Sequence, residues 1–308
     1  MIQPIFIFSM PRSGSTLLQK ILMSHDNISS HAEPWFLLNM ASMYKYKNVK
    51  SDFAYSALHV AVEDMIDSFE NKEEDLHKYI REFALNIYQN LSDENSIYFI
   101  DKTPRYFLII DFIAKVFPDA KFIFLTRDPL DTIVSYITSF NHNTIASFDQ
   151  YDTDFNIGFK AIASGYEKYK DRSILVNYEK LVTNDKEKIV SNIFEYLKIE
   201  NDKSVSENFS NQNLNGSMGD KNINSMKKIV FDEDKWKRTI YSNSRKKILL
   251  DIVQDIDDSY FDISDIDKKE LLSKIKTHKT NFNLVDFKDY QKTKIRRMIK
   301  KTINWDRY

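Results

Sequence analysis

The chain has 308 residues, and its 44 Lys and Arg side chains nearly balance its 45 Asp and Glu side chains, for a formal net charge of −1. This balance argues against a dedicated nucleic-acid binder, which carries a basic excess over a whole domain. The absence of cysteine excludes a disulfide framework, a thiolate metal site and a cysteine nucleophile.

Strand-like and helix-like patterns alternate along the chain. In chain order they predict a strand at 5–8, helices at 16–23, 36–47, 53–70 and 73–91, a strand at 96–100, a helix at 104–117, a strand at 121–125, helices at 129–140 and 156–169, a strand at 174–177, and helices at 179–183 and 186–197. The stretch 201–235 is polar and rich in turn residues, and further helix is expected from about 243.

This alternation predicts a parallel sheet with helices on both faces. We therefore predict one α/β domain over 1–308, built on a P-loop-like parallel β-sheet flanked by helices. The helices at about 36–95 form an insertion, and 243–308 forms an extra C-terminal helical segment. No internal repeat or low-complexity linker divides the chain.

The turn after the first strand has the composition of an anion-binding loop. Gly14 stands directly before a helix, where successive backbone N–H groups and the helix dipole attract a negative group. The hydroxyl groups of Ser13, Ser15 and Thr16 add donors, and Arg12 adds a fixed charge. An ordinary strand–helix turn with a Ser or Thr cap is the alternative interpretation.

The same turn differs from the nucleotide P-loop, G-x-x-x-x-G-K-[ST]. Gly14 and Thr16 occupy matching positions, but Ser9 replaces the first glycine and Ser15 replaces the lysine. Kinases and NTPases use that lysine on the β- and γ-phosphates. The turn therefore predicts an anion site without ATP hydrolysis, and a nucleotide kinase or NTPase is kept as an alternative.

A second strand–turn–helix unit covers 121–136, with Arg127 at the end of the strand and Ser135 in the helix. Together the two turns closely resemble the PAPS-dependent sulfotransferases, where PAPS is 3′-phosphoadenosine 5′-phosphosulfate. Arg127 and Ser135 match the family pattern that binds the 3′-phosphate. The segment 11–18 matches the 5′-phosphosulfate loop, which implies donor contacts from Arg12, Ser13, Gly14, Ser15 and Thr16.

Three shorter segments extend the resemblance toward the bacterial and tyrosylprotein branches of that family. The segment 176–182 is similar to V-x-Y-E-x-L-V, whose tyrosine, here Tyr178, lies near the nucleotide. The segment 101–104 is similar to a D/N-K-x-P pattern, and Lys235 stands in a K-W pair whose loop closes over the cofactor. The resemblance runs from about residue 4 to 240, with gaps at 40–95 and 140–170.

Sulfuryl transfer needs a base for the acceptor hydroxyl. The resemblance implies that Glu33, two residues before Trp35, is this base. His31 is the rival base, and a surface or helix-capping role for Glu33 is the alternative. Lys102, just past a strand end, is expected to reach the leaving oxygen and the sulfonate, unless it only forms a salt bridge with Asp101 or a neighbouring carboxylate. The predicted catalytic residues are Glu33, Lys102 and Arg12.

The resemblance implies transfer of a sulfonate from PAPS to a hydroxyl acceptor, with release of PAP. A sulfonate carries only one charge, and no His, Asp or Glu cluster has ligand spacing, so we expect no metal. The acceptor class stays open among carbohydrate, lipid, small molecule and peptidyl tyrosine, and no nucleic-acid partner is expected. A non-catalytic nucleotide-binding domain of the same fold is a further alternative.

The C-terminal run 290–305 is basic, with Ile295 and other apolar residues roughly on one face. Such a helix can make weak contact with an anionic membrane surface, whereas a terminal helix docked on the domain is the plainer interpretation. The apolar run 4–8 is too short for a signal peptide, and no run of about 18 apolar residues predicts a transmembrane helix. We expect a soluble, cytoplasmic protein; the sequence does not indicate an oligomeric state.

Overall fold

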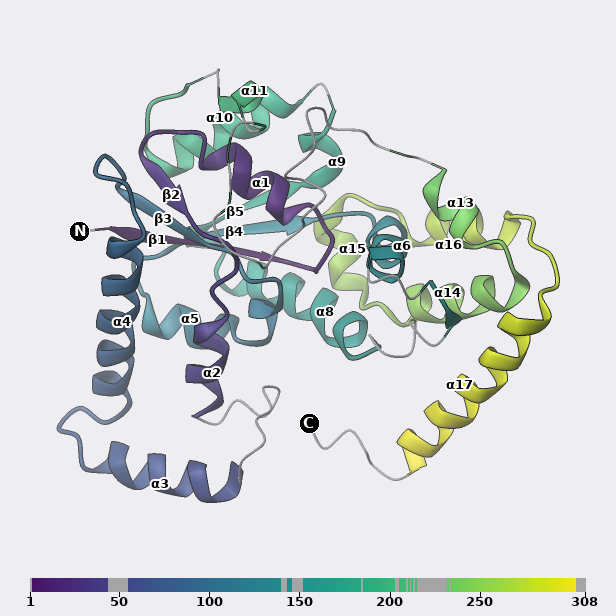
Figure 1. Cartoon of the computed structure of the whole chain (residues 1–308), viewed down its shortest axis with the longest axis horizontal. Helices are drawn as coiled ribbons and strands as arrows, with labels where there is room; N and C mark the ends of the chain where they lie inside the picture. The colour runs from purple at the N-terminus through teal and green to yellow at the C-terminus, as the bar shows by residue number, and fades with distance from the viewer. Residues whose placement is uncertain are drawn as a thin grey trace.

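The computed structural model describes residues 2–43, 55–139, 143–145, 152–183, 185–202, 205–208, 210, 212, 214, 232 and 234–302. At its centre is a five-stranded sheet with the strand order β2-β3-β1-β4-β5 (Figure 1). The strands are β1 (Gln3–Ser9), β2 (Ile28–Ser30), β3 (Tyr98–Asp101), β4 (Lys121–Thr126) and β5 (Ser173–Asn177).

All pairings in the sheet are parallel, and β1 lies at its centre. Phe6 of β1 is in register with Asp101 of β3 on one side and with Phe122 of β4 on the other. The strand after β1 in the chain, β2, lies beyond β3, so the order of the strands changes direction around β1. Ligands of open α/β sheets bind at such a switch point, beyond the carboxyl ends of the strands.

Helices surround the sheet on both faces (Figure 1). Their bounds are α1 Ser15–Leu22, α2 Phe36–Ser42, α3 Tyr55–Asp67, α4 Glu73–Asn90, η1 Pro104–Leu108, α5 Ile110–Val116, α6 Pro129–Ser139, α8 Asp152–Lys168, η2 Lys170–Arg172, α9 Tyr178–Leu181, α10 Lys186–Leu197, α11 Val205–Asn208, α13 Lys235–Thr239, α14 Asn243–Asp255, α15 Asp258–Ser264, α16 Lys268–Thr277 and α17 Leu284–Thr302. The predicted α/β fold, a P-loop-like parallel sheet flanked by helices, is confirmed.

The two faces of the sheet bury different kinds of side chain, because successive residues of a strand point to opposite faces. One face is aromatic and packs in a core shared with α5, α8 and the C-terminal helices; its centre is formed by Phe6, Phe8, Phe122 and Phe124. The other face is aliphatic and packs against α1 and α10; its centre is formed by Ile5, Ile7, Ile123 and Leu125. The strands β1 and β4 are therefore apolar on both faces, which is typical of a parallel sheet covered by helices.

The insertion helices and the C-terminal helices lie on opposite sides of the molecule (Figure 1). In the insertion, Tyr88 of α4 stacks on Phe99 of β3 with ring centroids 4.7 Å apart. On the other side, Trp236, Leu249 and Tyr260 join the core of the aromatic face. The C-terminal helices thus pack into the same core as the sheet.

The final helix, α17, points away from the sheet in Figure 1. Its Ile295 side chain is exposed, whereas residues 303–305 of the basic run lie outside the described residues. The predicted membrane-surface contact stays a prediction. No described helix combines the length and the apolar character that crossing a membrane requires.

Two local predictions were wrong. The short strand β2 was not expected, because only Ile28 of its residues is strongly apolar; its place is set by pairing with β3 and by the hydroxyl of Ser30, which donates to the carbonyl of Ile100 at 2.8 Å. The predicted helix at 104–117 is two helices, because Ile109 leaves the helical region with φ −133°. The polar stretch 201–235 lies mostly outside the described residues.

Candidate functional site

Each of the five strands is followed by one of the predicted site residues. Arg12 follows β1, Glu33 follows β2, and Lys102 follows β3. Arg127 follows β4, and Tyr178 follows β5. Because the strands are parallel, these five residues gather at one edge of the sheet, and the strand order places Glu33 and Lys102 on one side of the β1 turn and Arg127 and Tyr178 on the other.

The turn after β1 has the backbone of an anion-binding loop. Arg12 and Gly14 both adopt positive φ angles, 70° and 91°. The backbone N–H of Ser13 donates to the carbonyl of Met10 at 3.2 Å, and the Ser13 hydroxyl donates to the same carbonyl. Gly14 caps α1, so the first N–H groups of the helix have no partner within the helix and point toward the turn.

Gly14 is required here for a second reason, which is the close approach of Tyr178. A Cβ atom at position 14 would lie 2.2 Å from the Tyr178 ring. The guanidinium of Arg127 in turn lies over the same ring, 4.2 Å from its centroid, and its Nη1 donates to the carbonyl of Arg12 at 2.9 Å. The β1 turn, the end of β4 and the end of β5 are therefore one packed unit.

Positive charge gathers beside this unit. Burial, together with the charges of Arg12 and Arg127, lowers the pKa of Lys235. This lysine belongs to α13, which packs against α6. The Nε atom of Arg127 is buried and has no hydrogen-bond partner among the described residues. Ser135 is buried in the second turn of α6, the helix that follows Arg127 in the chain. Three cations and an unsatisfied donor fit a polyanionic ligand.

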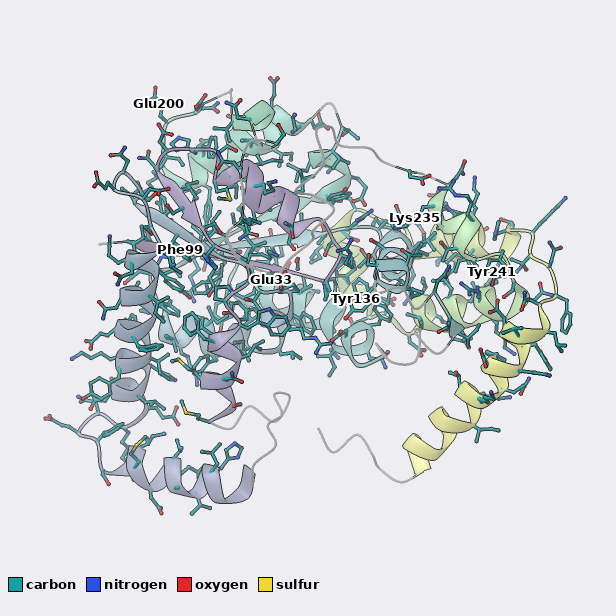
Figure 2. The ribbon with its side chains drawn as sticks, in the orientation of Figure 1. Glu33, Phe99, Tyr136, Glu200, Lys235 and Tyr241 are labelled. Carbon is teal, nitrogen blue, oxygen red and sulfur yellow. The ribbon has the colours of Figure 1, made fainter. Side chains whose placement is uncertain are left out.

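On the other side of the turn lies a buried carboxylate–lysine pair. The Nζ atom of Lys102 is 2.8 Å from Oε1 of Glu33, and it also donates to the hydroxyl of Thr16 at 3.2 Å. The second oxygen of Glu33 accepts from Nε1 of Trp35 at 3.1 Å. The predicted salt-bridge alternative for Lys102 is thus present, with Glu33 as its partner. Figure 2 shows Glu33 near the middle of the molecule and Lys235 toward the C-terminal helices.

The segment that carries Glu33 is fixed by side chains from two neighbouring elements. Gln19 of α1 donates to the Ser30 hydroxyl at 2.7 Å and to the His31 carbonyl at 2.9 Å. The backbone N–H of Trp35 donates to the Thr103 hydroxyl at 3.3 Å. Glu33 does not cap α2, whose N-cap is Trp35. The rival base, His31, has its Nδ1 atom 3.0 Å from the carbonyl of Ala32.

Sequence reasoning named Asp101 as an alternative partner of Lys102, but it missed that this carboxyl group is buried in a network with two tyrosines. Asp101 is fully buried and accepts hydrogen bonds from the hydroxyls of Tyr88 at 2.6 Å and Tyr106 at 3.0 Å. Burial raises the pKa of Asp101 to about 7, although these hydrogen bonds oppose the shift. The tyrosines come from α4 and η1, and no sequence pattern pairs them with position 101. This network fixes the end of β3, from which Lys102 extends.

Among the described residues, no group of three or more His, Asp or Glu side chains is arranged to hold a metal ion. An anion-binding turn at the switch point of a parallel sheet is typical of α/β proteins that bind a phosphate-bearing ligand.

The profile of the Sulfotransferase family matches residues 4–203. The chain belongs to this family, which confirms the resemblance found in the two turns. Lys235 and the C-terminal helices lie beyond the matched residues.

Two curated relatives and one solved structure illustrate the relationship. The nodulation protein NoeE of Sinorhizobium fredii is 31% identical over 125 residues, which are 40% of this chain and 28% of that protein. Protein-tyrosine sulfotransferase 1 of Danio rerio is 27% identical over 200 residues, 63% of this chain and 53% of that protein. The chain therefore spans about half the length of these relatives, or less.

The sulfotransferase domain from the olefin synthase of Synechococcus PCC 7002 superposes with a TM-score of 0.56 at 24% sequence identity. The superposition covers 82% of this chain and 93% of that domain. This likeness shows the fold.

Proposed function

We propose that this protein transfers a sulfonate group from PAPS to a hydroxyl of an acceptor and releases PAP. The observation that carries the proposal is the contact of one lysine with both halves of the site. Lys102 touches Thr16 in the anion-binding turn and Glu33, the candidate base. A base and a donor-binding loop that share a cation are suited to moving a proton and an anionic group in one reaction.

The chain's own residues fit the two charged ends of PAPS. The turn after β1 offers backbone N–H groups and hydroxyls for the 5′-phosphosulfate, from Arg12, Ser13, Gly14, Ser15 and Thr16. The unsatisfied Nε of Arg127 and the nearby Lys235 fit the 3′-phosphate, together with Ser135. Tyr178 lies between these two regions, because it contacts both Gly14 and Arg127.

In the proposed reaction, PAPS supplies the sulfonate. The acceptor oxygen forms a bond to sulfur while the bond from sulfur to the bridging phosphate oxygen breaks, and Glu33 takes the acceptor's proton. Lys102 and Arg12 face the negative charge that develops on the leaving oxygen. As Glu33 becomes neutral, the charge of Lys102 is no longer compensated by its carboxylate partner. The lysine then stabilises the leaving phosphate more strongly.

A transfer assay with ³⁵S-labelled PAPS tests this proposal. Purified protein is offered carbohydrate, lipid, small phenolic and tyrosine-peptide acceptors, each with and without excess EDTA. We expect labelled product in at least one acceptor class, with the same rate in EDTA, since a singly charged sulfonate needs no divalent cation. Magnesium-dependent ATP turnover without sulfate transfer would instead identify a nucleotide kinase or NTPase. Tight PAP binding without any turnover would identify a non-catalytic nucleotide-binding domain.

A further inference from the structure

One residue of the C-terminal helices holds the backbone of Arg127. The hydroxyl of Tyr260, on α15, accepts a hydrogen bond from the Arg127 N–H at 3.0 Å and donates one to the Arg127 carbonyl at 2.9 Å. Tyr260 is fully buried, and its ring packs edge-on against Phe159 with centroids 4.7 Å apart. Both backbone groups of Arg127 are thus bound by a single side chain from a distant part of the sequence.

The same helix also contacts the end of β5. The side-chain amide of Asn177 donates to the carbonyl of Ser264 at 3.1 Å, and Lys180 forms an ion pair of 2.6 Å with Asp265. Tyr178 lies between these two contacts in the chain. Figure 1 shows α15 beside the ends of β4 and β5. The helix therefore ties together the two strand ends that carry Arg127 and Tyr178.

The position of the Arg127 side chain depends on this backbone anchor. Its guanidinium must lie over the Tyr178 ring and also reach the Arg12 carbonyl. The next residue is held too, because the backbone N–H of Asp128 donates to Oε1 of Glu179 at 2.9 Å. The turn after β4 is fixed from two sides, by α9 through Glu179 and by α15 through Tyr260. A fixed backbone lowers the entropy that an arginine loses when it binds an anion.

We propose that Tyr260 is a positioning residue that holds Arg127 in place to recognise the donor's 3′-phosphate. In this proposal α15 contributes to the donor site. The proposal rests on the proposed function, because it requires Arg127 to bind that phosphate. The matched family profile ends at residue 203, well before α15. Tyr260 acts through Arg127 and does not itself contact the donor.

The experiment compares Tyr260→Phe with a matched control on α10, a helix that packs on the same sheet. Phenylalanine keeps the ring that packs on Phe159 and removes only the hydroxyl. The control is Tyr196→Phe, because the Tyr196 hydroxyl also bridges two backbone groups, accepting from Phe122 N–H at 3.1 Å and donating to the Arg172 carbonyl. Those groups lie at the start of β4 and just before β5, at the opposite edge of the sheet.

Calorimetry then measures binding of PAP and of AMP, which lacks the 3′-phosphate, to each protein. In Tyr260→Phe, we expect PAP affinity to fall about ten-fold, because a displaced Arg127 loses about one well-placed hydrogen bond to the 3′-phosphate. AMP affinity should change less than about two-fold. In Tyr196→Phe, the ratio of PAP to AMP affinity should equal that of the wild type. A protein with only a weakened core would lose stability in both variants without changing this ratio.

A second variant protects the test against a folding defect. Phe159→Leu removes the ring that supports Tyr260, and we expect a smaller fall in the PAP-to-AMP ratio, in the same direction. If Tyr260→Phe and Phe159→Leu both keep the wild-type ratio, the positioning role is wrong while the proposed function stands. If the wild type itself binds PAP and AMP equally, the proposed donor is wrong, and the role of Tyr260 is overturned with it.

Discussion

The Nζ atom of Lys102 lies 2.8 Å from Oε1 of Glu33, and both side chains are buried, with 1% and 8% of their surface exposed. The two residues are 69 positions apart in the chain and follow neighbouring strands, β3 and β2. The same Nζ donates to the Thr16 hydroxyl. The candidate base is thus connected to the anion-binding turn by one side chain, and this connection makes the roles of both residues testable.

Replacing Glu33 with Gln should abolish the proposed base. An amide cannot take a proton at neutral pH, and losing a positioned base lowers a rate by about 10²–10⁴-fold. The amide also has one acceptor oxygen for two donors, Lys102 and Trp35, so one hydrogen bond is lost. Steady-state transfer assays should show the fall in kcat, and PAP affinity should stay within about two-fold of the wild type.

The control for this prediction is His31→Ala, which should keep most of the activity. If Glu33→Gln turns over normally and His31→Ala is inactive, the base is His31.

Replacing Lys102 with Met should lower both stability and turnover. Removing one partner of a buried ion pair costs about 3–5 kcal/mol, because the remaining charge is left without compensation. Adding Glu33→Gln to this variant removes the uncompensated charge, so the double variant should recover part of the free energy of unfolding, measured in urea. Its activity should stay as low as that of the single variants, because both groups serve the same step. A double variant less stable than Lys102→Met would contradict this coupling.

Replacing Arg127 with Ala should remove most of the preference for a 3′-phosphate. Hydrogen bonds to charged groups contribute about 1.5–3 kcal/mol, which corresponds to about ten- to hundred-fold in PAP affinity. Arg172→Ala is the matched control, because this guanidinium also lies 4.2 Å from an aromatic ring, that of Phe122, and donates to backbone carbonyls. It precedes β5, at the edge of the sheet far from the site. Calorimetry should show normal PAP binding in this control, and equal losses in both variants would argue against the assignment.

The buried Asp101 predicts a pH dependence of stability. Burial raises its pKa to about 7, above the ordinary value of a carboxyl group, so the folded protein holds this proton more tightly than the unfolded chain does. The contribution of Asp101 to stability is therefore fully present at low pH and is lost as the pH rises from about 4 to about 7. In the Asp101→Asn variant the side chain cannot ionise, so the variant does not show this loss of stability with rising pH.

Urea unfolding of the wild type and Asp101→Asn between pH 5 and pH 8 measures this effect. The wild type should lose stability relative to the variant up to about pH 7, and the difference should then level off. Asp131, whose pKa burial and the Asp128 charge raise to about 6, shifts stability in the same direction but is present in both proteins. A difference that stays constant across the range would show that Asp101 keeps its charge throughout.

The sequence alone determined which turns are candidates for the donor site. The turn at Arg12–Thr16 and the pair Arg127 and Ser135 could be singled out because their patterns are local in the chain: a glycine before a helix, and an arginine at a strand end. Four of the five strands could be predicted for a similar reason, because they are continuous apolar runs long enough to be distinctive. The family followed from these local patterns.

Tertiary structure alone decided how these turns act together. The strand β2 has too few apolar residues to be recognised, and it forms because β3 offers it a partner 70 residues away. The contact of Lys102 with Glu33 and the hold of Tyr260 on Arg127 depend on the order in which strands and helices pack. Such pairings are set by burial and by hydrogen bonding between distant segments, and neither leaves a periodic pattern in the residues themselves.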